Sequence, residues 1–166
     1  GQILMAKKDY DAAYNLYDAI NRSADRSPAS YYAASLVLDA RGDTVTAQIE
    51  LLDSALAMFL DPMPADAANY VLRRGKLYER AGIYRKAVLD YNKFCYLSNN
   101  QVNANFYYDR SVLETKARMY QQAVDDINMA VSAEPNNILF LVEKCALMLR
   151  VNMLDECVET ARKCIS

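Results

Sequence analysis

One spacing recurs along this chain of 166 residues: a small residue is followed, twelve positions later, by a second small residue. The pattern occurs five times, at Gly1 and Ala13, Ser35 and Ala47, Gly75 and Ala87, Ser111 and Ala123, and Cys145 and Cys157. Successive pairs are separated by steps of 34, 40, 36 and 34 residues. Periods of this length indicate an array of stacked supersecondary units, each too small to bury its hydrophobic face alone.

Mostly large residues lie at fixed offsets from these pairs. Three residues after the first member the chain has Leu4, Leu38, Tyr78, Glu114 and Met148, and four residues after the second it has Tyr17, Leu51, Tyr91, Ile127 and Ala161. Residues three or four apart share one face of an α-helix, so each pair predicts two packed antiparallel helices. We expect Gly75 to face Ala87, where a Leu would overpack by about 1–3 kcal/mol. Glu114 replaces an apolar residue, which predicts looser packing in its unit.

Local signals predict where several helices begin. Ser27 is expected to cap a helix with Pro28 at its first position. Asp9 and Asp43 are expected to cap the second helices of the first two units. Turn sequences such as "ARGD" and "RAGI" separate the paired helices, and the prolines at 62 and 64 are expected to break the chain between the second and third units.

The segment "VLRRGKLYERAGIYRKAVLDYNKF", residues 71–94, resembles the tetratricopeptide repeat (TPR), a helix–turn–helix unit of 34 residues. It has Gly75, Tyr78, Gly82, Tyr84, Ala87 and Tyr91 where the repeat motif expects them. Residues 106–137 match next best, and the resemblance extends over essentially the whole chain. It implies an all-α fold, a right-handed TPR superhelix (α-α solenoid) with about nine full helices and a truncated first one. A single array over 1–166 is expected, with units at 1–27 (truncated), 28–63, 64–100, 101–137 and 138–166.

The resemblance also implies where a ligand would bind. In this family the first helices line the concave surface of the superhelix, which holds an extended or helical peptide. The side chains expected there are Tyr32, Leu36, Asp39, Leu72, Lys76, Glu79, Tyr108, Val112 and Thr115, followed by Val142, Ala146 and Leu149. Such a groove suits rigid aromatic anchoring. The alternative is that some of them pack on the adjoining first helix. The Lys and Asn set that holds chaperone C-termini in some members is absent, so chaperone-tail binding is not predicted.

Two pairs of opposite charges recur at the same spacing. Arg74 and Arg110 each precede a small-pair residue, and Asp90 and Asp126 follow sixteen residues later. We expect each arginine to bind its aspartate and so to join the two helices of its hairpin. The alternative is that these charges are separately solvated.

Composition argues against several function classes. The chain has no histidine, and its four cysteines have no metal-ligand spacing, so we predict no metal and no cofactor. A net charge of −2 without a basic stripe argues against nucleic-acid binding, and no apolar run is long enough for membrane insertion. Cys145 and Cys157 could form a disulfide in an oxidising compartment. No catalytic constellation is apparent, so we do not expect an enzyme.

The leading prediction is a non-catalytic scaffold that binds a protein or peptide in the concave groove. One alternative is a structural spacer or self-association module of a larger protein, acting through the exposed ends of the array. Another is part of an exported envelope-assembly lipoprotein. Free cysteines and the lack of a visible signal favour the cytoplasm, with export left open.

Overall fold

The structure is a computed structural model that describes the backbone of residues 9–165 and the side chains of residues 9–162. All regular elements within that range are helical, which confirms the all-α prediction. They are α2 (Tyr10–Arg22), α3 (Pro28–Arg41), α4 (Val45–Leu56), the short 3-10 helix η1 (Ala65–Ala67), α5 (Ala68–Arg80), α6 (Tyr84–Leu97), α7 (Ala104–Lys116), α8 (Tyr120–Ala133), α9 (Ile138–Arg150) and α10 (Leu154–Ile165). Gly1 and Leu4 of the predicted first unit lie outside the described residues.

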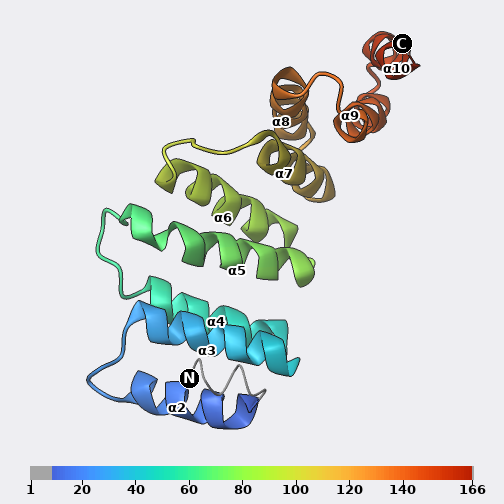
Figure 1. Ribbon diagram of the computed structural model, residues 1–166. Coiled ribbons are helices and arrows are strands. Elements are labelled where there is room, and N and C mark those ends of the chain that lie inside the picture. The colour runs from blue at the N-terminus through green and yellow to red at the C-terminus, as the bar shows by residue number, and fades with distance from the viewer. Residues whose placement is uncertain (1–8, 166) are drawn as a thin grey trace. The chain divides into compact units, whose positions relative to one another are not determined.

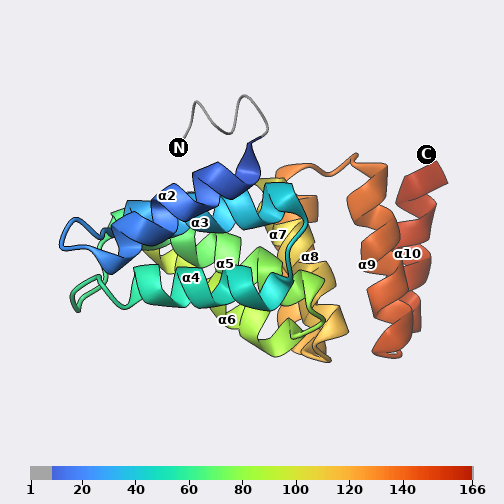
Figure 2. The same ribbon diagram turned by 90° about the horizontal axis from the view of Figure 1, so that it is seen from below.

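The helices form two compact units, one up to residue 99 and one from residue 100. In the first unit, α2 to α6 pack consecutively, each helix against the next (Figure 1). In the second unit, α7 packs on α8, α8 on α9 and α9 on α10, and α7 also touches α9. Figure 2 shows α9 and α10 side by side. Short turns make the two helices of each hairpin antiparallel, and within each unit successive hairpins stack as in an α-solenoid. The described residues contain no helix of the length and apolarity needed to span a membrane.

The four hairpin turns in the described part of the chain share one backbone conformation. Gly42, Gly82, Arg118 and Asn152 have positive φ angles of 86°, 73°, 61° and 61°. They follow one another at steps of 40, 36 and 34 residues, the same steps as the small pairs. In each turn the next backbone N–H donates to a carbonyl five residues earlier, at Leu38, Tyr78, Glu114 and Met148, over 2.8–2.9 Å. This is the Schellman arrangement, which satisfies the last carbonyl groups of each first helix.

Two of the three predicted helix caps are confirmed. The Ser27 hydroxyl accepts from the Ser30 backbone N–H at 3.2 Å, and the Ser30 hydroxyl accepts from the Ser27 N–H at 3.0 Å. Pro28 occupies the first position of α3. At α2, the Asp9 carboxylate accepts from the Ala12 N–H at 3.2 Å. These bonds satisfy backbone donors that have no partner inside the helix.

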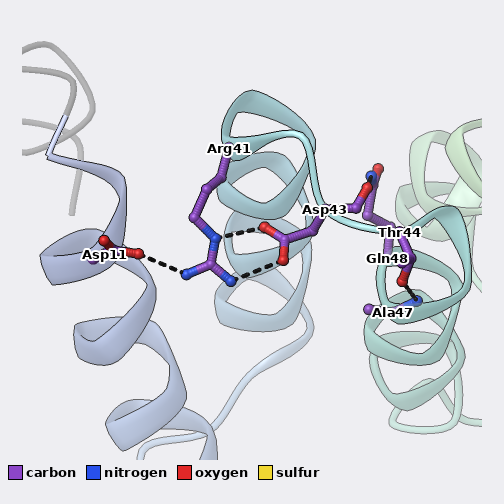
Figure 3. Close-up of polar contacts among 6 residues, drawn as sticks. All are labelled: Asp11, Arg41, Asp43, Thr44, Ala47 and Gln48. Atoms are coloured by element: carbon purple, nitrogen blue, oxygen red, sulfur yellow. Dashed lines mark hydrogen bonds and ion pairs between the residues drawn. The ribbon is translucent and has the colours of Figure 1, made fainter.

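The prediction that Asp43 caps α4 is wrong. Thr44 is the cap, and its hydroxyl accepts from the Ala47 N–H at 3.4 Å. Both carboxylate oxygens of Asp43 instead accept from the Arg41 guanidinium, which also donates to Asp11 of α2 at 2.9 Å (Figure 3). Asp43 follows the left-handed turn residue, so its side chain points back toward the end of α3, and the next residue is left to cap α4.

A close approach of α5 and α6 at Gly75 is confirmed, but its partner differs from the prediction. A Cβ at Gly75 would lie 3.0 Å from Tyr91 Cδ2 and 3.1 Å from Asp90 Cβ. The nearest atoms therefore belong to these residues, one turn beyond Ala87, which is itself fully buried.

Both predicted Arg–Asp pairs are present. Arg74 donates to Asp90 through Nε and Nη2 at 2.8 and 2.7 Å, and a third nitrogen reaches Asp53 of α4 at 2.7 Å. Arg110 donates to Asp126 through the same two nitrogens, with 2.7 Å between Nη2 and Oδ1. Both aspartates are buried, so the two-bond geometry joins the two helices of each hairpin and compensates the buried charge.

The last hairpin brings its two predicted cysteines close together, and no disulfide joins them. Cys145 Sγ donates to the Cys157 carbonyl at 3.6 Å. Across the described part of the chain, no group of three or more His, Cys, Asp or Glu residues is placed to hold a metal ion.

Candidate functional site

A pocket of about 350 Å³ lies between α3 and α5 in the first unit. Its lining residues are Tyr32 and Asp39 of α3 with Asn69, Leu72, Arg73, Lys76, Leu77 and Arg80 of α5. The α5 residues lie one or three positions from the next, a pattern that keeps them all on one face of that helix. Both contributing helices are first helices of their hairpins, as the predicted groove requires.

Four predicted groove residues meet in this pocket: Tyr32, Asp39, Leu72 and Lys76. Leu36, which is 38% exposed, and Glu79, which is half-buried, lie on the same helices but outside the lining. Four lining residues were missed by the sequence prediction: Asn69, Arg73, Leu77 and Arg80. A signal for two of them existed, because Asn69 and Arg80 continue the three-to-four spacing of Leu72 and Lys76 in both directions along α5.

Tyr32 is held in place by an aromatic row. Its ring meets Tyr70 edge-to-face with the centroids 4.9 Å apart, and Tyr70 meets Phe59 in the same way at 5.3 Å. The Arg73 guanidinium lies 5.7 Å from the centroid of the Tyr32 ring. Such contacts restrict the orientation of a ring, so the Tyr32 side chain has a fixed place on the pocket wall.

Arg73 is fixed by the backbone of α3 as well as by Tyr32. Its Nε donates to Ser35 Oγ at 3.1 Å and its Nη2 donates to the Ser35 carbonyl at 3.3 Å. Ser35 is completely buried, and its hydroxyl donates in turn to the Tyr32 carbonyl at 2.8 Å. The small residue that lets α3 pack closely therefore also positions a cation in the pocket.

Asp39 supplies the carboxylate of the pocket lining, and it is shared between two arginines. Arg80 Nη1 donates to Asp39 Oδ1 at 2.7 Å, and Arg73 Nη2 lies 3.6 Å from Oδ2. The hydrogen bond from Arg80, aided by the charge of Arg73, lowers the pKa of Asp39 below its usual value. Asp39 is therefore ionised at neutral pH, and its charge is compensated within the protein.

The remaining predicted groove residues lie in the second unit. Tyr108 is half-buried and stacks on Phe140 of α9 with the ring centroids 5.3 Å apart. Burial, with the negative charge of Glu143, raises the pKa of Tyr108. Val112 and Thr115 are half-buried on α7, and the Thr115 hydroxyl donates to the Ser111 carbonyl at 2.9 Å.

On α9 of the same unit, Val142 and Leu149 are more than half exposed. Tyr108 thus follows the alternative reading, packing on the adjoining first helix, while α9 presents apolar side chains to solvent. Whether Tyr108, Val112 and Thr115 contact a ligand stays a prediction.

Comparison with known proteins identifies the fold of the chain. No protein-family model matches the sequence, and no curated protein matches it. Solved structures do match: YrrB, described as a TPR protein with an unusual peptide-binding site, has a TM-score of 0.77 at 12% identity, covering 98% of this chain and 79% of that one. MamA from Desulfovibrio magneticus RS-1 has a TM-score of 0.73 at 16% identity, covering 98% and 87%. This chain has the fold of TPR proteins. At such identities the likeness concerns the fold, and it confirms the resemblance seen in the sequence.

Proposed function

We propose that this chain is a non-catalytic scaffold that binds an extended peptide of a partner protein in the α3–α5 pocket. The observation that carries the proposal is the pocket itself, which combines a fixed aromatic ring, Tyr32, with an apolar wall at Leu72 and a cation at Lys76. Peptide-binding surfaces typically pair such an anchor with a few polar groups. The shared fold supports a role in protein interaction at a general level.

The test is selection from a random octapeptide display library on the immobilised chain. Leu72→Arg adds a long charged side chain inside the pocket, and it should reduce the capture of enriched peptides at least tenfold. Leu89→Arg is the matched control, because Leu89 is 67% exposed on α6 and lines a separate pocket of about 270 Å³ between α5 and α6. Capture that survives Leu72→Arg and is lost in Leu89→Arg would place the peptide elsewhere and refute the proposal.

A second candidate function, self-association through the end of the array, is favoured by the surface of α10. Val88 and Val124 hold equivalent places on α6 and α8 and are 1% and 8% exposed, whereas Val158 on α10 is 52% exposed. Leu154 on the same helix is 56% exposed. If a second copy covers this face, the chain forms dimers that Val158→Glu dissociates, as measured by light scattering over a concentration series.

A further inference from the structure

The pocket between α3 and α5 carries a charge opposite to that of the whole chain. Three cationic side chains, Arg73, Lys76 and Arg80, line it together with one carboxylate, Asp39. The lining therefore has a surplus of two positive charges, whereas the chain has a net charge of −2. A concave surface of one sign attracts ligands of the other sign and repels those of its own.

Packing does not account for the lysine in this pocket. Lys76 is exposed, and the equivalent positions one residue beyond the small pairs hold Leu36, Val112 and Ala146. The other first helices thus fold with an apolar residue at this place. Lys76 lies one helical turn from Leu72 and two turns from Asn69. Its positive charge belongs to the pocket, and its side chain adds nothing to the core.

The one acidic group of the lining does not compensate all three cations. Asp39 accepts from Arg80 at 2.7 Å and lies 3.6 Å from Arg73. Its single negative charge therefore compensates only one of these two positive charges. Arg73 is held further by Ser35 and Tyr32 and has a fixed direction. A ligand carboxylate near Lys76 and Arg80 would meet a charge surplus that exists before binding, which avoids the cost of reorganising the side chains.

From these observations we infer that the pocket selects an acidic peptide segment, with an Asp or Glu carboxylate of the ligand lying between Lys76 and Arg80 and an apolar neighbour against Tyr32 and Leu72. The inference rests on the proposed peptide-binding function and adds the chemistry of the partner. A peptide fits better than a nucleic acid, because polyanion binding needs a long row of cations and this chain has three in one pocket and an acidic balance overall.

The test uses the same octapeptide selection on the full chain, with two charge-matched variants. K76Q/R80Q removes two cations from the pocket, and R85Q/K93Q removes two exposed cations from α6. The wild-type chain and R85Q/K93Q should enrich peptides rich in Asp and Glu, and K76Q/R80Q should lose that bias. For the most enriched peptide, replacing its acidic residues by Asn or Gln should weaken binding about tenfold. Addition of about 300 mM NaCl should reduce this difference in affinity between the two peptides, because salt screens the charges.

The possible failures are distinguishable. If the wild-type chain enriches neutral or basic peptides, the acidic preference is wrong and the proposed function stands. An acidic bias that persists in K76Q/R80Q, or that R85Q/K93Q removes equally, also overturns the preference, because it then reflects charge elsewhere. If no peptide is enriched, the proposed function falls and this inference falls with it.

Discussion

At the scale of single residues, Glu114 is the clearest departure from the repeat. The equivalent positions hold Leu38, Tyr78 and Met148, and the sequence suggested looser packing around a carboxylate. Glu114 is instead only 2% exposed. Burial, with the neighbouring charge of Asp126, raises the pKa of Glu114 to about 8 although Arg110 opposes the shift. The sequence identified the unusual residue but could not predict its protonation, because that depends on burial and on which side chains surround it.

This pKa makes stability depend on pH in a window with few other titrating groups, since the chain has no histidine. Between pH 4.5 and about 8 the folded chain keeps a proton on Glu114 that the unfolded chain releases. As the pH rises across that window, this one group should therefore lower the free energy of unfolding by about 1.4 kcal/mol per pH unit. Glu114→Gln should remove that slope. In urea unfolding, the free energy of unfolding of the variant relative to the wild-type chain should therefore be higher at pH 8 than at pH 5. Equal pH dependence in both proteins would contradict the account.

Gly75 offers a second prediction at this scale. Replacing a glycine inside a helix by alanine usually stabilises by about 0.5–1 kcal/mol. Here the new Cβ would meet Tyr91 at 3.0 Å and Asp90 at 3.1 Å, so Gly75→Ala should instead cost about 1–3 kcal/mol in urea unfolding. Ser111→Ala is the control, since a Cβ is already accommodated at that equivalent place, and it should cost less than about 1 kcal/mol. A stabilised Gly75→Ala variant would show that the two helices do not need this close approach.

At the scale of helices and turns, the repeat steps carry most of the information. They predicted the helix pairs, and each of the four hairpin turns among residues 9–165 has a left-handed residue at the same steps: Gly42, Gly82, Arg118 and Asn152. Glycine marks only two of the four turns, so residue type alone would miss the others. The prediction of Asp43 as the cap of α4 failed because the neighbouring Thr44 can also cap a helix, and Asp43 binds Arg41 instead.

The turn geometry predicts a stabilising substitution. A residue other than glycine in the left-handed region costs roughly 1–2 kcal/mol, and Arg118 has a φ of 61°. Arg118→Gly should therefore raise the free energy of unfolding by about 1 kcal/mol, as measured by urea denaturation. Asn152→Gly should gain less, because asparagine tolerates this conformation better. A loss of stability in Arg118→Gly would mean that the arginine side chain contributes more than its backbone costs.

At the scale of the molecule, the sequence predicted four of the residues that line the α3–α5 pocket but not the rest of its lining. The pocket brings Tyr32, Leu72 and Lys76 together as expected, and it adds Arg73 and Arg80, which the prediction did not include. Their placement depends on side-chain contacts with Ser35 and Asp39, across 38 and 41 residues of sequence, and helical periodicity does not specify such contacts. In the second unit, the stacking of Tyr108 on Phe140 was likewise open from the sequence.

The central claim is that a peptide binds in the α3–α5 pocket, and amide chemical-shift mapping tests it most directly. A selected octapeptide would be titrated into the isotopically labelled chain. The account predicts that the largest shifts cluster on the pocket face of α3 and α5, around Tyr32, Leu72 and Lys76, and that Leu72→Arg abolishes them. Shifts centred on α6 or α10, with these residues unchanged, would contradict it.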